Sequence, residues 1–251
     1  MKSRAVIIAN TTGLPGVDID VSNITSFLKS IEGGAWFDDD IEILRNFSRE
    51  NLLNRLSHLR REAYDFVMVF FAGHGGRNNN TDLLFLNREN EYIEIEYIKN
   101  IAARQINIID CCRAEVSDED LAMISEASVA LEKHGGERIG YLSARQKYAS
   151  RIMASGPQQI NLFGCSLNEC SAETKDGGLY LSLLLMKARK FSSEDRAFQT
   201  VISSHIDISQ KVTLKAASLG NTQHPDYLSP RIPESRQLII SINPFSVSHF
   251  Y

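Results

Sequence analysis

The sequence lacks a long apolar run: none approaches 18 residues, so no segment is predicted to cross a membrane. The apolar part of the N-terminus is too short for a signal peptide, and we therefore expect a cytoplasmic protein. An excess of basic residues is also missing. The net charge is −4, which predicts no basic face and argues against a nucleic-acid partner. Cysteines are few, and the adjacent Cys111 and Cys112 are poorly placed to bridge, which predicts free thiols.

What is present is an ordinary globular composition, with 43% hydrophobic and 23% charged residues. A chain of 251 residues is long enough for one sizeable α/β domain. Apolar runs alternate with segments of helical spacing, which predicts one domain with a mostly parallel sheet. The expected strands cover residues 4–10, 40–44, 64–72, 106–110, 159–165 and 237–242, with a hairpin over 83–95. The expected helices cover residues 18–31, 48–61, 119–133, 178–190 and 194–219, with a short one ending near 103.

The stretch 107–115, NIIDCCRAE, changes from apolar to reactive residues within nine positions. Its isoleucines are typical of a buried strand in a parallel sheet. The strand ends in an acid and two thiols, Asp110, Cys111 and Cys112. Open α/β sheets bind their ligands beyond the carboxyl ends of their strands. Because successive residues of a strand face opposite sides, only one of the two cysteines is expected to face a given neighbour.

A second apolar run, residues 64–72, ends in Gly73, His74, Gly75 and Gly76. A hairpin and a short helix separate the two runs, so they can form neighbouring strands that bring His74 close to a thiol. An imidazole stabilises a thiolate and returns a proton to a leaving amine. The alternative is a structural histidine beside a cysteine that acts only as a small hydrophobic residue.

Gly75 adds a second indication of catalysis, because a residue without a Cβ lets its N–H approach a substrate carbonyl closely. The N–H groups of Gly75 and Cys112 are predicted to form an oxyanion hole.

Two motifs resemble those of the caspase clan, and especially of the metacaspases. Residues 70–76, FFAGHGG, resemble the strand that carries the catalytic histidine, and residues 110–114, DCCRA, resemble the Asp-x-Cys motif. The catalytic cysteine is the third residue of that motif, which selects Cys112 over Cys111. Residues 16–24 and 163–178 are similar to the first helix and to the start of the small-subunit region.

This resemblance implies a caspase-like three-layer α/β sandwich around a mostly parallel, six-stranded sheet with helices on both faces. The whole chain, 1–251, would form one peptidase domain. Within it, residues 1–113 would correspond to the large subunit, 114–156 to a connector, and 157–251 to the small subunit.

The resemblance also bears on specificity. The two arginines with which caspases bind an aspartate are missing, since Leu14 and Glu173 take their places. Asp20 and Asp110 match the acids with which metacaspases bind Arg or Lys. The resemblance therefore implies cleavage after a basic residue, with Glu173 as a further acid. The alternatives are that Asp20 is an acid of a helix first turn and that Asp110 caps a strand end.

Two further expectations follow from the resemblance. The substrate is expected to pair along residues 171–173, from Ser171 to Glu173, as an added strand. The connector is expected to be a site of self-cleavage. It contains the basic residues Lys133, Arg138, Arg145, Lys147 and Arg151.

The sequence thus predicts a cysteine endopeptidase with catalytic His74 and Cys112, acting in regulated cell death or defence. Its partners would be a protein substrate with an exposed Arg or Lys site and a separate activator or sensor protein. No metal site and no cofactor are predicted, because the acids of a metacaspase calcium site do not recur as a cluster. Two alternatives stay open: a catalytically silent caspase-like scaffold or sensor that binds protein partners, and thiol redox chemistry at Cys111 and Cys112.

Overall fold

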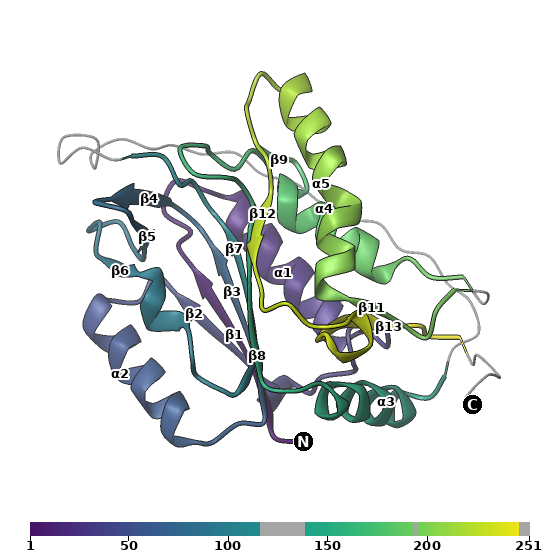
Figure 1. The fold of residues 1–251 in the computed structure, drawn as a ribbon. Coiled ribbons are helices and arrows are strands. Elements are labelled where there is room, and N and C mark those ends of the chain that lie inside the picture. The colour runs from purple at the N-terminus through teal and green to yellow at the C-terminus, as the bar shows by residue number, and fades with distance from the viewer. Residues whose placement is uncertain (116–138, 193–194, 246–251) are drawn as a thin grey trace.

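A six-stranded sheet forms the centre of the computed structural model, which describes residues 1–115, 139–192 and 195–245 (Figure 1). The strand order is β12-β8-β7-β3-β1-β2, and all neighbours are parallel except β12 and β8. The predicted fold class, a mostly parallel sheet with helices on both faces, is confirmed.

The strands of this sheet are β1 (Ser3–Ala9), β2 (Ile41–Arg45), β3 (Phe66–Ala72), β7 (Arg104–Asp110), β8 (Gln158–Phe163) and β12 (Asp226–Leu228). The α-helices are α1 (Gly16–Lys29), α2 (Arg49–Arg61), α3 (Tyr141–Ala154), α4 (Leu179–Arg189) and α5 (Val201–Ser218). A small sheet contains β4 (Gly75–Asn78), β5 (Thr81–Phe85) and β6 (Tyr92–Glu94), and is followed by a 3-10 helix, Ile95–Ile98. Two further pairs are β9 (Glu173–Thr174) with β10 (Gly177–Gly178), and β11 (Phe198–Thr200) with β13 (Ile239–Ile242). Short 3-10 helices cover Asp38–Asp40 and Glu234–Arg236.

The central strands are buried on both faces, which explains why their sequences are continuous apolar runs. In β3, Phe66, Met68 and Phe70 face the core beneath α1, α3, α4 and α5. The alternate residues, such as Val69 and Phe71, face a second core beneath α2 and the small β4–β6 sheet. Figure 1 shows these two layers on opposite sides of the sheet. This packing fixes the positions of the strand ends.

The second half of the chain departs from the sequence expectations in three places. The expected connector, 114–156, contains α3, whose buried Ala144, Tyr148 and Ile152 belong to the core. The sequence does not predict this helix, because charged residues between these positions obscure its apolar spacing. The expected strand 237–242 is present as β13, but it pairs with β11 outside the central sheet. The sixth strand of the sheet is the short β12, which the sequence did not reveal.

Other differences are smaller. The helix expected over 194–219 begins at Val201, after β11. β4 was expected to be loop. The helix expected over 119–133 lies outside the described residues. None of the described helices has the length and apolar composition needed to span a bilayer.

Candidate active site

The two strands that carry the predicted catalytic residues are neighbours. β3 pairs with β7 in parallel register, and Ala72 lies opposite Asp110 at the carboxyl edge. His74 and Cys112 each follow one of these paired residues by two positions. The predicted neighbourhood of the two strands is therefore confirmed.

His74 is held by a backbone carbonyl. Its Nε2 lies 2.9 Å from the carbonyl oxygen of Thr12, in the loop after β1. A carbonyl oxygen only accepts, so Nε2 carries a hydrogen and a neutral ring keeps a free lone pair on Nδ1. Burial lowers the pKa of His74, which favours that neutral, basic form near pH 7. The role of Thr12 was not predicted, because a backbone acceptor leaves no signature in the residue type.

The two adjacent cysteines have different surroundings. Cys111 is 4% exposed and packs into the core beneath α2, and burial raises its pKa well above the usual value. Cys112 is only partly buried. A Cβ on Gly75 would lie 2.4 Å from Cys111 Sγ and 2.6 Å from the Cys112 carbonyl oxygen, so only glycine fits there. Cys111 is thus a packing residue, and Cys112 is the more accessible thiol.

A third thiol, on Cys170, interacts with that of Cys112. This interaction lowers the pKa of Cys170 to about 7, and together with burial it raises the pKa of Cys112. Because the two thiols titrate together, the proton that leaves near neutral pH is lost by the pair. The sequence did not predict this contact, since Cys170 belongs to a loop far along the chain.

Asp20 and Asp110 lie together under Gly177 and Gly178. The Gly178 N–H donates to Asp20 Oδ1 at 3.0 Å, and a Cβ on Gly178 would lie 2.4 Å from Asp110 Oδ2. The N–H of Leu181 donates to Asp110 Oδ2 at 3.0 Å, while Asp110 Oδ1 is buried without a hydrogen-bond partner in the described structure, although the Ser171 hydroxyl lies near enough to lower the pKa of Asp110 in part. Burial raises the pKa of both acids. The pocket acids predicted from the sequence are therefore brought together.

Glu173 and Ser171 lie next to these acids. Glu173 Oε1 accepts the N–H of Gly16 at 2.6 Å, at the start of α1. The Ser171 hydroxyl donates to the Cys111 carbonyl at 3.2 Å. We call Asp20, Asp110 and Glu173 the acidic cluster. None of the ion pairs between described residues includes any of them.

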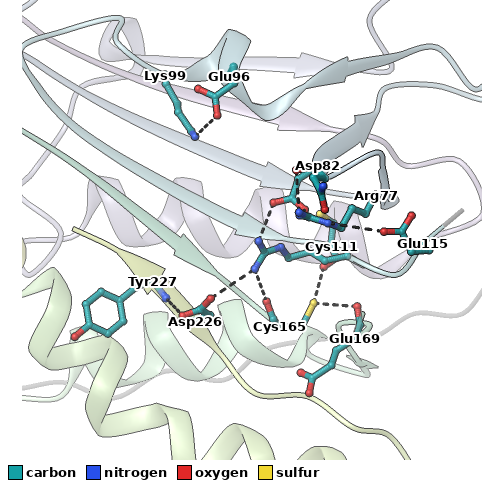
Figure 2. Close-up of polar contacts among 12 residues, drawn as sticks. Arg77, Asp82, Glu96, Lys99, Cys111, Glu115, Cys165, Glu169, Asp226 and Tyr227 are labelled. Carbon is teal, nitrogen blue, oxygen red and sulfur yellow. Dashed lines mark hydrogen bonds and ion pairs between the residues drawn. The ribbon is translucent and has the colours of Figure 1, made fainter. Parts of the chain in front are cut away.

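A second charged group, the arginine cluster, consists of Arg77 in β4, Asp82 in β5 and Arg113 in the segment after β7. Figure 2 shows Arg77 beside Asp82. Asp82 accepts from both guanidinium groups at 2.8 Å. Arg113 also donates to the Cys165 carbonyl, and its backbone N–H donates to the carbonyl of Glu169 at 2.8 Å. These contacts hold the backbone on the carboxyl side of Cys112.

A cavity of about 430 Å³ lies away from these residues, between α3 and the β11–β13 pair. It is lined by Ser143, Gln146, Lys147, Ser150, Arg151, Ala197, Phe198, Ile242, Asn243 and Phe245. This lining contains no cysteine, histidine or carboxylate. Among the described residues, no group of three or more His, Cys, Asp or Glu side chains is arranged to hold a metal ion.

Comparisons with known proteins identify the family and the fold of the chain. The model of the caspase domain family, Peptidase_C14, matches residues 2–235. Among solved structures, the fold is similar to that of caspase-1 from Spodoptera frugiperda, with a TM-score of 0.57 and 13% sequence identity. That similarity covers 90% of this chain and 86% of the other. No curated protein matches the sequence.

Proposed function

Because the chain belongs to the caspase domain family of cysteine peptidases, we propose that it cleaves peptide bonds after Arg or Lys with His74 and Cys112 as its catalytic dyad. The observation that carries the basic specificity is the acidic cluster, whose buried Asp110 Oδ1 has no hydrogen-bond partner in the described structure. The resemblance to metacaspases supports the same specificity, and so does the finding that no ion pair between described residues includes a member of the acidic cluster.

In the proposed reaction, His74 accepts the proton of the Cys112 thiol, and the sulfur attacks the substrate carbonyl carbon and breaks the carbonyl π bond. The resulting oxyanion is stabilised by the N–H groups of Gly75 and Cys112. His74 transfers a proton to the leaving amine as the C–N bond breaks, and a water molecule then hydrolyses the thioester with His74 as the base. The hydrogen bond to Thr12 orients the imidazole for both transfers.

The substrate's basic side chain would enter beside Asp110 and Asp20. Each acid already accepts one backbone N–H, from Leu181 and Gly178 respectively. A guanidinium group would supply the missing donor to Asp110 and neutralise acids whose burial disfavours their charge. An aspartate side chain would instead add a further negative charge. The same geometry that favours Arg or Lys therefore disfavours the caspase type of substrate.

The test uses three fluorogenic peptides that differ only in the residue before the cleaved bond: Arg, Lys or Asp. We expect turnover of the Arg and Lys peptides and none of the Asp peptide. Cys112→Ala and His74→Ala are the controls and should each remove turnover. Turnover of the Asp peptide alone would overturn the proposed pocket. No turnover, together with no labelling of Cys112 by a covalent peptide inhibitor, would favour the silent scaffold.

The structure bears on which basic residues of the expected connector are candidates for self-cleavage. Arg145, Lys147 and Arg151 lie in α3, where Arg145 pairs with Asp40 and Arg151 donates to the carbonyl of Gln237. Cleavage at any of the three would require the helix to unwind. We therefore place the proposed self-cleavage at Lys133 or Arg138, which lie outside the described residues. Intact masses after incubation, compared with Cys112→Ala, test this: identical single species would remove the proposal.

A further inference from the structure

The backbone around Cys112 pairs with the loop before β9. The N–H of Arg113 donates to the Glu169 carbonyl at 2.8 Å, and the N–H of Asn168 donates to the Arg113 carbonyl at 3.1 Å. This is antiparallel pairing in which two residues of the loop oppose Arg113, as in a β-bulge. One residue before Arg113 in the first segment and one residue after Glu169 in the second, Cys112 and Cys170 form the next pair of opposed residues. The register therefore brings these two cysteines together.

Such an adjoining pair in an antiparallel ladder has no hydrogen bonds between its own backbones, and its Cβ atoms lie about 4.5–5.5 Å apart. Disulfides need about 3.5–4.5 Å, so a small inward movement suffices. The two thiols are also near enough to shift each other's pKa, lowering that of Cys170 to about 7. The Ser171 hydroxyl reaches the carbonyl of Cys111, which continues the same pairing by one residue. Geometry thus favours a bond between Cys112 and Cys170.

Accessibility and ionisation distinguish this pair from the other two cysteines. Cys112 and Cys170 are partly exposed, whereas Cys111 and Cys165 are buried. Burial raises the pKa of both buried thiols, that of Cys165 to about 12, which leaves them protonated and unreactive. The exposed pair loses a proton near neutral pH because its two thiols interact. An oxidant would therefore meet a reactive thiolate only at this pair.

We propose that Cys112 and Cys170 form a reversible disulfide when a peroxide oxidises the active site, and that this bond blocks the nucleophile. The Cys170 thiolate attacks one peroxide oxygen, so that an S–O bond forms, the O–O bond breaks and hydroxide leaves. The product is a sulfenic acid on Cys170. The hydroxide takes the proton of the Cys112 thiol, the Cys112 sulfur attacks the sulfenic sulfur, the S–S bond forms, and the S–O bond breaks to release a second hydroxide. With the proton that Cys170 had lost, two thiols and hydrogen peroxide become one disulfide and two waters.

This disulfide would serve two purposes. It withdraws the nucleophile while the oxidant persists, and it prevents further oxidation of Cys112 to the irreversible sulfinic and sulfonic acids. A dithiol reductant restores both thiols by exchange. The inference goes beyond the proposed peptidase specificity and is independent of it, since it requires only the chemistry of the two sulfurs.

The test treats the full-length protein with hydrogen peroxide, denatures it, and alkylates the remaining thiols for mass spectrometry. The protein has four cysteines. We expect the oxidised protein to lose two alkylatable thiols and the mass of two hydrogen atoms. Both changes should reverse with dithiothreitol. A glutamyl endopeptidase that cuts after Glu169 separates Cys165 from Cys170, so the linked fragment should contain Cys170.

The variants Cys170→Ser and Cys112→Ala should each prevent the cross-link, and Cys165→Ala should leave it intact. In Cys170→Ser, peroxide should instead add oxygen atoms to the fragment that contains Cys112, and dithiothreitol should no longer restore the activity that this variant had before treatment. Retention of all four thiols in the native protein, or a cross-link that omits Cys170, would overturn the proposal. Since the masses require no turnover, a failed peptidase assay does not affect this result.

Discussion

The acidic cluster lies on the α1 side of the β7 end and consists of three carboxylates. The arginine cluster lies on the side of the small β4–β6 sheet and pairs its one carboxylate with two guanidinium groups. Asp82 in the arginine cluster accepts from two guanidinium groups at 2.8 Å. Asp110 in the acidic cluster is more deeply buried than the half-buried Asp82, but it receives one backbone N–H and no cation from the described residues. Burying a carboxylate without a partner is costly.

The difference indicates two purposes for buried charge. In the arginine cluster the partners are internal, and Arg113 connects them to the backbone beside Cys112. In the acidic cluster a partner is missing, and burial raises the pKa of Asp20 and Asp110 as a result. Because the fold keeps these carboxylates buried without a cation, we expect a cationic ligand to offset the unfavourable free energy of their burial when it binds. Substitutions in the two clusters should therefore affect different quantities.

The largest expected effect is that of Asp110→Asn on catalysis. Removing one partner of a buried charge pair costs about 2–5 kcal/mol, so kcat/KM for the Arg peptide should fall by about 30-fold to several thousandfold. The free energy of unfolding should change little or increase, because the buried, unpaired charge is removed while the Leu181 N–H keeps an acceptor. Peptide kinetics and urea denaturation measure the two quantities. An unaltered kcat/KM would exclude Asp110 from the pocket.

Asp82→Asn should show the opposite pattern. Breaking this pair leaves the guanidinium groups of Arg77 and Arg113 without their shared carboxylate, and we expect a loss of about 3 kcal/mol in the free energy of unfolding. The preference for Arg over Asp peptides should remain, because no pocket residue changes. Urea denaturation provides the measurement. If Asp82→Asn altered the peptide preference while leaving stability intact, the distinction between the two clusters would fail.

A third buried group, His205, extends the comparison to a base. Its ring contacts Tyr180 of α4 and Tyr227 of β12. Burial lowers the pKa of His205 to about 4, and the charge of Asp226 partly opposes this shift. The unfolded state therefore binds a proton more readily between pH 6.5 and 4, so stability is present above this range and is lost as the pH falls. The loss between pH 7 and pH 5 should be about 2 kcal/mol.

The control for this prediction is His205→Asn, whose amide oxygen can replace Nδ1 as the partner of Tyr180 but cannot titrate. Unfolding free energies of the two proteins at pH 7 and pH 5 give the contribution of His205 by difference. Equal acid sensitivity would show that other groups cause the loss.

The first half of the fold was predictable from the sequence because its strands have uninterrupted apolar runs. β1, β3 and β7 are buried on both faces, so each of them has apolar residues on both faces of the sheet. β12 was not predictable, since it is a three-residue edge strand whose Tyr227 and Leu228 are exposed. β13 has strand composition, but composition does not name its partner, β11.

The site was predictable where the reactive residues sit directly after a strand. His74 and Cys112 follow two paired strands, so chain order alone brought them to one edge. Thr12 and Cys170 were missed because they belong to loops, whose positions depend on tertiary contacts. Local sequence cannot report a contact between a strand end and a loop that lies 58 residues along the chain, as in the case of Cys112 and Cys170.

The smallest expected effect is that of Glu173→Gln, which sharpens the order of importance within the acidic cluster. Glu173 is more exposed than the two aspartates, and its Oε1 is already engaged by the Gly16 N–H. Glutamine keeps that acceptor and removes only a solvent-screened charge, so kcat/KM for the Arg peptide should fall by no more than about fivefold. The peptide kinetics used for Asp110→Asn measure it. A loss as large as that of Asp110→Asn would make Glu173 the principal anion, and the buried position of Asp110 would then no longer explain specificity.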